Sequence, residues 1–291
     1  MSPLATVYAD AGLKTSPQAG TQPDEEYLGL DPAAPLKTVA SGDKGVLGQA
    51  HVPSTFSWDG RWNGSAAFLR PDGDTVWQGQ PLVLSARRDP SWAMTYPSAP
   101  VSLSQDAGTY GAHGGSGLST VGGSIRDGEL SSPDPIRHAL KMEIDCRAYC
   151  YFAGVNKSHR WPAVVEDDPV NGTRYGGTNP KLMPGALLAL PKSFDVSRLT
   201  TGQGRKVAQA MKDYGAYMVD ETAGDYYAFG VEIKALDEWH AGRGWYPGTV
   251  DPAVSADFQK MYPALKIIDN NGPTAVGGGG TPLVQKAPPF N

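Results

Sequence analysis

The stretch Gly108-Thr-Tyr-Gly-Ala-His-Gly-Gly-Ser-Gly-Leu-Ser-Thr-Val-Gly-Gly-Ser-Ile-Arg-Asp-Gly-Glu-Leu130 contains more glycine than a regular helix or strand tolerates. Its backbone must therefore pass through tight turns or left-handed conformations. Glycine at so many positions indicates that the main chain approaches another segment or a ligand closely. Between the glycines stand His113, Ser116, Arg126, Asp127 and Glu129, whose side chains carry chemistry.

Two of these side chains are candidates for catalysis or ligand binding. His113 is a candidate general base or proton donor, and Ser116 a candidate nucleophile or anion-binding hydroxyl. The alternative is that the glycines only build a bend, with His113 bonded to neighbouring backbone. Ser116 does not stand in the Gly-x-Ser-x-Gly elbow of serine hydrolases, and no buried strand precedes the glycines as in a dinucleotide-binding fingerprint.

Carboxylates form a second candidate set. Asp127 and Glu129 would share one face of an extended chain, and paired carboxylates perform acid and base steps in glycoside cleavage. Asp220 and Glu221 follow a predicted strand and are expected to project from its end. The carboxylates that could complete a catalytic pair with Asp127 or Glu129 are Asp167, Asp168, Asp220 and Glu221. Equally, Arg126 and Arg137 could neutralise Asp127 and Glu129 in a structural ion-pair network.

Aromatic residues in predicted loops are typical of sugar recognition, because ring faces stack on apolar sugar faces. Arg160, Trp161 and Tyr175 lie in a long polar region and join Ser116 and Arg126 as candidate ligand-binding residues. Many of the aromatic residues are equally expected in the core. The set comprises Trp58, Trp62, Trp92, Trp161, Tyr175, Trp239, Trp245 and Tyr246.

Composition narrows the classes of function. The 291-residue chain has a formal net charge of -5 and no basic segment, so nucleic acid is not an expected partner. No apolar run approaches the roughly 18 residues that a membrane span needs, and the N-terminus lacks a secretory signal pattern. No metal site or cofactor is expected, because no ligand pair has zinc-like spacing and no cofactor fingerprint is complete.

The two cysteines occur in the segment Ile144-Asp-Cys-Arg-Ala-Tyr-Cys-Tyr-Phe152, which is expected to continue a strand that begins near Met142. In a strand, Cys146 and Cys150 would lie about 13 Å apart at roughly 3.3 Å per residue, too far for a disulfide. The sequence therefore predicts two buried free thiols.

The fold is predicted to be mainly β with short helices, arranged as a β-sandwich or jelly roll, because 36 Gly and 25 Pro with 19% charged residues describe many short elements. Residues 1–48 are predicted to form an extended N-terminal arm with little core of its own, and 49–291 a single β-rich domain. A hairpin is expected over 66–78, a clear helix over 203–212, and short helices starting near 134 and over 252–261.

Several motifs together resemble a poorly characterised family of secreted bacterial proteins and tail proteins of actinobacterial phages. They are Ala112-His-Gly-Gly-Ser-Gly-Leu-Ser119, Gly122-Gly-Ser-Ile-Arg-Asp-Gly-Glu-Leu130, Arg160-Trp-Pro-Ala163, Asp213-Tyr-Gly-Ala-Tyr217, and Asp269-Asn-Asn-Gly-Pro273 before Gly277–Gly280. The resemblance covers about residues 55–290 and transfers no catalytic residue. It implies a virion tail location, with an extracellular location as the alternative.

The resemblance and the candidate residues give three hypotheses. The first is a phage tail component that contacts a cell-surface polysaccharide of the host, forms an oligomer, and joins other virion proteins through the N-terminal arm. The second is a glycosidase or lyase that cleaves such a polysaccharide with paired carboxylates. The third is a purely structural tail protein.

Overall fold

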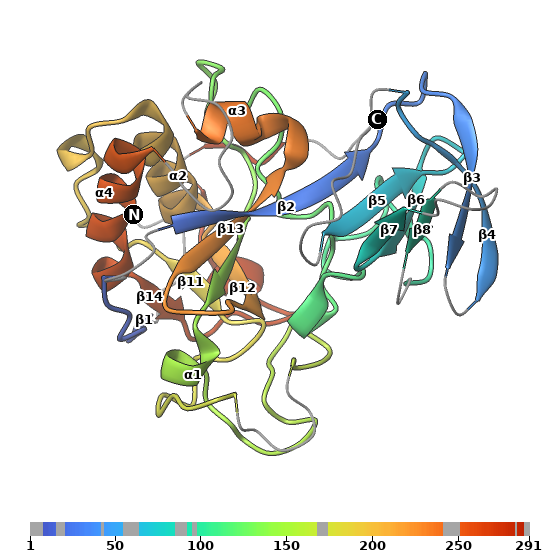
Figure 1. Ribbon diagram of the computed structural model, residues 1–291. Helices are drawn as coiled ribbons and strands as arrows, with labels where there is room; N and C mark the ends of the chain where they lie inside the picture. The colour runs from blue at the N-terminus through green and yellow to red at the C-terminus, as the bar shows by residue number, and fades with distance from the viewer. Residues whose placement is uncertain are drawn as a thin grey trace.

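The computed structural model describes residues 8–15, 21–41, 44–54, 64–84, 92–94, 98–167, 174–240, 251–282 and 284–287. The mainly β class with short helices is confirmed (Figure 1). The strands are β1 (Tyr8–Asp10), β2 (Thr21–Gly29), β3 (Leu36–Ser41), β4 (Gly45–His51), β5 (Ser65–Leu69), β6 (Thr75–Gly79), β7 (Leu82–Leu84), β8 (Trp92–Met94), β9 (Val101–Ser102), β10 (Leu140–Ile144), β11 (Leu187–Ala189), β12 (Ala216–Glu221), β13 (Tyr227–Glu232) and β14 (Lys266–Ile268). The α-helices are α1 (Cys146–Tyr149), α2 (Gly202–Asp213), α3 (Leu236–Trp239) and α4 (Pro252–Met261).

Ten strands form one mixed sheet in the order β1-β14-β11-β12-β10-β13-β2-β5-β6-β9, and four form a second sheet in the order β4-β3-β8-β7. In the large sheet β10 pairs in parallel with β12, and β2 pairs in parallel with both β13 and β5. These parallel pairs distinguish the sheet from the antiparallel sheets of a jelly roll. The second sheet lies at the far side of the molecule from α2 and α4 (Figure 1).

One face of the large sheet carries the main hydrophobic core. Met142, Met218 and Phe229 on the central strands pack in one buried cluster with Met211 of α2 and Phe258 of α4. Helix α2 begins at the N-cap Thr201, whose side chain accepts a hydrogen bond from Gly204 N. Because the apolar side chains of these strands take this face, their polar side chains project from the opposite face.

Some of the predictions for local structure are confirmed, and one is wrong. The hairpin over 66–78 is confirmed as β5 and β6, and the helices over 203–212 and 252–261 as α2 and α4. The predicted helix near 134 is wrong, because 133–139 contain turns and bends but no helix.

The expected N-terminal arm with little core is also wrong for its central part. Strand β2 lies between β13 and β5 in the large sheet, and Tyr27 and Leu28 are buried. Its polar residues, which suggested an exposed segment, face a buried polar cluster described below. The segment that was expected to lie outside the domain is thus part of its sheet.

The expectation of free thiols is corrected as well. Strand β10 ends at Ile144, and Cys146–Tyr149 form the helical turn α1, with Asp145 as its N-cap. A turn of helix brings residues four apart together, so the Cα atoms of Cys146 and Cys150 lie 4.3 Å apart and the two residues form a disulfide.

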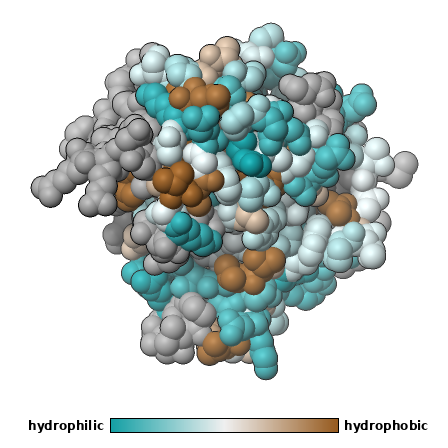
Figure 2. All heavy atoms as spheres, turned by 90° about the vertical axis from the view of Figure 1, so that its right-hand side faces the viewer, coloured by the Kyte–Doolittle hydropathy of each residue, from teal (hydrophilic) through white to brown (hydrophobic). Residues whose placement is uncertain are grey.

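The face of the molecule on the side of β3 and β4 is mostly hydrophilic (Figure 2). Hydrophobic residues occur there as separate spots and not as one broad patch. Within the described ranges, every helix is too short or too polar to cross a membrane.

We predict that Leu28→Ala lowers the free energy of unfolding by about 2–5 kcal/mol, because it truncates a side chain that is 2% exposed in the middle of the sheet. The matched control is Leu36→Ala in β3, which removes a side chain that is 45% exposed and should cost less than about 1 kcal/mol. Urea unfolding measures both. Equal, small losses would contradict the placement of β2 in the core.

Candidate functional site

Charged side chains meet on the polar face of four neighbouring strands. Glu143 of β10 pairs with Asp220 of β12, and Asp24 of β2 pairs with Gly230 of β13. Paired residues on adjacent strands project from the same face, so the carboxyl groups of Glu143 and Asp220 stand side by side. The register between β10 and β12 shifts by one residue at Val219, and this bulge places Asp220 on the polar face.

Small residues on β13 make room for this cluster. A Cβ on Gly230 would lie 2.7 Å from Lys141 Cε and 3.2 Å from Glu26 Oε1. The space above Gly230 is instead filled by the aliphatic part of the Lys141 side chain, whose Nζ donates to Glu26 Oε1 at 2.5 Å and to Thr120 O at 2.8 Å. Lys141 is 2% exposed and Glu26 is fully buried.

The glycine-rich stretch closes over the cluster. Its short 3-10 helix, Gly114–Ser116, contacts β12, and a Cβ on Gly114 would lie 2.5 Å from Asp220 Oδ2. A Cβ on Gly115 would overlap the Asp220 carboxylate, and Gly115 has a φ of +45°. Close approach of the main chain to Asp220 is therefore the reason for glycine at both positions.

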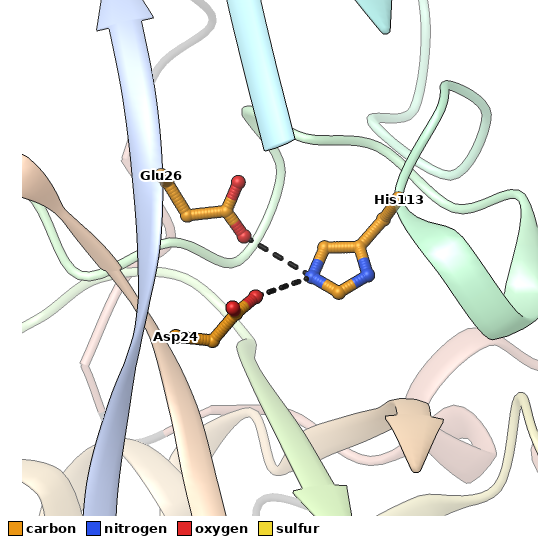
Figure 3. Close-up of side chains that lie close together, drawn as sticks. All are labelled: Asp24, Glu26 and His113. Carbon is orange, nitrogen blue, oxygen red and sulfur yellow. Dashed lines mark hydrogen bonds and ion pairs between the residues drawn. The ribbon is translucent and has the colours of Figure 1, made fainter. Parts of the chain in front are cut away.

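His113 sits at the centre of the cluster and is 2% exposed. Its Nε2 lies 3.1 Å from Asp24 Oδ2, 3.2 Å from Glu26 Oε1 and 3.9 Å from Glu143 Oε1. Figure 3 shows the carboxylates of Asp24 and Glu26 reaching from the same strand toward one ring nitrogen. On the other side of the ring, Nδ1 lies 3.8 Å from Asp220 Oδ2.

The charges of this cluster follow from these contacts. Burial and Lys141 oppose a charge on His113, but Glu26 and Asp24 outweigh them and raise the His113 pKa to about 9. Burial alone would raise the pKa of Asp24, yet the hydrogen bond and charge of His113 hold it below its usual value. At neutral pH, His113 is therefore an imidazolium beside an ionised Asp24.

Two carboxyl groups beside this ion pair stay protonated. Burial and the charges of Asp24 and Asp220 raise the pKa of Glu143 well above its usual value, and Glu143 hydrogen-bonds to Asp24. Burial also raises the pKa of Asp220 to about 8, against the opposing effect of His113. The cluster thus places the ionised carboxylate of Asp24 beside two neutral carboxyl groups, and such a combination can perform acid and base catalysis.

The carboxyl groups open into a polar pocket of about 310 Å³. Its lining includes Asp24, Glu143 and Asp220 together with Asp167, Arg174, Glu221 and Tyr226. Arg174 Nη1 bonds to Asp167 Oδ2 at 3.2 Å and to Glu221 Oε1 at 2.5 Å. Burial, and then Asp167, raise the pKa of Glu221 to about 7.

Asp24, Glu26 and His113 are also the one group of three metal-ligating side chains that converges among the described residues. A cation at their centre would lie beside the Lys141 ammonium group, which bonds to the same Glu26 oxygen at 2.5 Å. It would also have to displace the proton from His113, whose pKa is raised to about 9. These contacts favour a proton over a metal ion at this position.

Of the catalytic candidates, Asp220 and Glu221 line this pocket, and His113 lies beneath it with Nδ1 3.8 Å from Asp220 Oδ2. It does not bring Asp127 or Glu129 there. Glu129 accepts hydrogen bonds from Arg126 N and from His138 Nε2, and Asp127 is exposed. Arg126 acts on Glu129, as the structural alternative expected, whereas Arg137 donates to the carbonyl oxygens of Gln285 and Lys286.

The five candidate ligand-binding residues do not line the pocket. Ser116 is buried and its Oγ accepts from Leu118 N. Arg126 is half-buried near Glu129 and Glu232, whose charges act on it.

The remaining three stand in the long polar region. Arg160 donates to the carbonyl oxygens of Lys181 and Asp269, and Trp161 is half-buried. Tyr175 is buried, and its hydroxyl accepts from Asp167 N, so it supports a wall of the pocket.

Some candidates cannot be placed in this way. Asp168, Trp58, Trp62, Trp245 and Tyr246 lie outside the described residues, and the side chain of Trp92 is not described. Trp239 is fully buried in the main core, as the alternative reading of the aromatic residues expected.

Sequence reasoning missed Asp24, Glu26, Lys141 and Glu143. For Lys141 and Glu143 the signal is charge alternating with apolar residues, because the two flank Met142 and so lie on one face of a buried strand. Asp24 and Glu26 are separated by Glu25 and show no such alternation. Buried charges of opposite sign on one face need partners close by.

Comparison of the chain with protein-family models, with curated proteins and with solved structures gives no match. The chemistry of the site therefore rests on its own geometry.

We predict that Gly115→Ala destabilises the fold by about 1–3 kcal/mol, because the added Cβ meets the Asp220 carboxylate and the positive φ strains alanine. Gly128→Ala is the matched control, since Gly128 also has a positive φ of +84° but no atom within 4 Å of its Cβ position. Thermal unfolding should show the smaller loss for Gly128→Ala. A larger loss for that variant would refute the close packing on Asp220.

We also predict opposite pH dependences for two aspartates. The pKa of Asp220 is raised on folding from 3.8 to about 8, so this group destabilises the fold increasingly as pH rises through that interval. As the pH rises from roughly 5 to 8, Asp220→Asn should therefore become progressively more stable than the parent protein.

Asp257 provides the control with the opposite sign. Despite burial, hydrogen bonds from the Thr200 and Thr201 backbone lower its pKa from 3.8 to about 2. Its stabilisation is present above pH 3.8 and lost toward pH 2, so Asp257→Asn should be destabilising at neutral pH. Urea unfolding at several pH values measures both variants, and a pH-independent effect of Asp220→Asn would contradict a neutral Asp220.

Proposed function

We propose that this protein cleaves glycosidic bonds of a cell-surface polysaccharide by acid and base catalysis in the pocket formed by Asp24, Glu143 and Asp220. The observation that carries the proposal is the presence of an ionised carboxylate and a neutral carboxyl group on the same cavity. Glycoside hydrolysis uses such a pair, one group to protonate the leaving oxygen and the other to act as base or nucleophile.

The contacts suit each carboxyl group to one role. Asp220 keeps its proton up to about pH 8 and donates it to the glycosidic oxygen as the bond from that oxygen to C1 breaks. Asp24, held as an anion by His113 and Glu143, either takes a proton from the attacking water or bonds to C1 itself. In the second case, water then releases the sugar from Asp24.

The pocket also has the size and surface for a sugar unit. Its volume of about 310 Å³ lies at the lower end of the range for small-molecule sites. The half-buried ring of Tyr226 is part of the lining and offers a flat face for stacking. Gln22 and Gln80 add neutral hydrogen-bonding groups to the lining.

A virion tail location on an actinobacterial phage is part of the proposal and is supported by the motifs alone. A tail protein that binds the glycan without cleaving it is the second candidate. His113 and Glu129 fit that candidate or a structural role better than a direct role in catalysis, because neither side chain lines the pocket. Asp24 and Asp220 favour catalysis.

Incubation of the protein with purified actinobacterial cell-wall polysaccharides should release new reducing ends. Asp24→Asn and Asp220→Asn should each lower kcat/KM by about 10²–10⁴-fold. The rate should fall as the pH rises past about 8, because Asp220 then loses the proton that it donates.

Asp127→Asn is the matched control, because it removes an exposed carboxylate outside the pocket and should leave the rate unchanged. Retention of the polysaccharide without new ends would support the binding-only candidate. Full activity in Asp24→Asn or Asp220→Asn would refute the catalytic assignment.

A further inference from the structure

The lining of the pocket is strongly biased toward one sign of charge. Among the described residues it contains six carboxyl groups and a single basic side chain, Arg174. The carboxyl groups belong to Asp24, Glu25, Glu143, Asp167, Asp220 and Glu221; because Glu143 and Asp220 stay protonated, the negative charge of the lining comes from the other four. A cleft lined by groups of one sign concentrates their field and selects ligands of the opposite sign.

Arg174 is not available to bind an anionic ligand, because it already bonds to two carboxyl groups. Its Nη1 lies 3.2 Å from Asp167 Oδ2 and 2.5 Å from Glu221 Oε1. The other cations nearby, Lys141 and His113, are buried beneath the pocket and bonded to Glu26. An anionic ligand would thus meet carboxylates without a cation to receive it.

A single metal ion fits these carboxyl groups poorly. Of the described residues, only Asp24, Glu26 and His113 bring three ligand atoms within 4.8 Å of one another, and Lys141 bonds to that group. The carboxyl groups of Asp167, Asp220 and Glu221 form no such group. Because these carboxyl groups are spread over the pocket wall, they suit an organic cation with additional polar groups better than a single metal ion.

His113 supplies an independent indication of a ligand. Its side chain is 1% exposed, and Nδ1 has no hydrogen-bond partner among the described residues. That nitrogen faces Asp220, whose Oδ2 is 3.8 Å away, beyond hydrogen-bond distance. An oxygen of a ligand seated beside Asp220 would accept the hydrogen bond that Nδ1–H lacks.

We infer that the pocket binds an amine-bearing sugar unit, with a hydroxyl oxygen near His113 and its ammonium group beside Asp167 and Glu221, two carboxyl groups that share the single positive charge of Arg174. This substrate class rests on the proposed function for the assumption that the ligand is a sugar. Charge-assisted hydrogen bonds from an ammonium group to carboxylates contribute about 1.5–3 kcal/mol each, or roughly tenfold or more in affinity.

The same charges argue against uronic acids as substrates. A lyase that removes the proton next to a uronate carboxylate must neutralise that carboxylate, and the described lining offers only the engaged Arg174. Of the two cleavage reactions expected from the sequence, hydrolysis therefore fits the pocket better than elimination.

Matched sugars test this inference with the full chain at pH 7. Glucosamine, N-acetylglucosamine and glucuronate share one ring and differ in charge, and galactosamine, N-acetylgalactosamine and galacturonate form a second series. NMR shift titration should show that the amine of at least one series binds about tenfold or more tightly than its N-acetyl and uronate counterparts. Added salt should weaken that binding.

Variants locate the interaction. Asp167→Asn should weaken binding of the amine about tenfold, and Asp127→Asn, outside the pocket, should leave it unchanged. The inference is overturned if neither amine binds, if an N-acetyl sugar or uronate binds equally well in both series, or if calcium displaces the amine at equal concentration.

These experiments distinguish a failure of the binding inference from a failure of the proposed cleavage. Amine binding without release of reducing ends from any polysaccharide would refute the proposed hydrolysis and retain the cationic-sugar site. Cleavage without amine binding would retain the hydrolysis and refute the inferred substrate class.

Discussion

The pairing of the His113 imidazolium with Asp24 and Glu26 is the interaction on which the rest of the site depends. Five ionisable groups, Asp24, Glu26, Lys141, Glu143 and Asp220, surround this ring beneath a shell of small residues. Burying so many carboxyl groups together is costly unless cations are buried with them or protons neutralise them. His113 and Lys141 supply two positive charges, and the protons of Glu143 and Asp220 remove two negative ones.

The backbone around this ion pair is adapted to its volume. Gly230 leaves the space that the Lys141 side chain occupies, and Gly114 and Gly115 let the glycine-rich stretch lie directly on Asp220. The bulge at Val219 turns Asp220 toward that stretch. Electrostatics and shape are therefore coupled, because any side chain at these glycines would push apart the groups that set the charges of the cluster.

The sequence predicts those features that depend on neighbouring residues. The hairpin of β5 and β6, helices α2 and α4, and the close approach of the glycine-rich stretch all follow from local patterns. It does not predict the position of β2, because a polar strand in the centre of a sheet is stable only through partners distant in sequence, such as Lys141 and His113. The Cys146–Cys150 disulfide was missed for another reason, since apolar alternation in β10 concealed the start of α1.

The central property of the site is its charge state: a positive His113 holds Asp24 ionised while Asp220 keeps a proton. Titration of the His113 ring and of the Asp220 carboxyl carbon by NMR tests this claim most directly. We expect His113 to remain protonated at both nitrogens at neutral pH with a pKa of about 9, and Asp220 to ionise near pH 8. A His113 that titrates near 6.5, together with an Asp220 that is ionised below pH 5, would contradict the account, since these are close to the ordinary values of the two side chains.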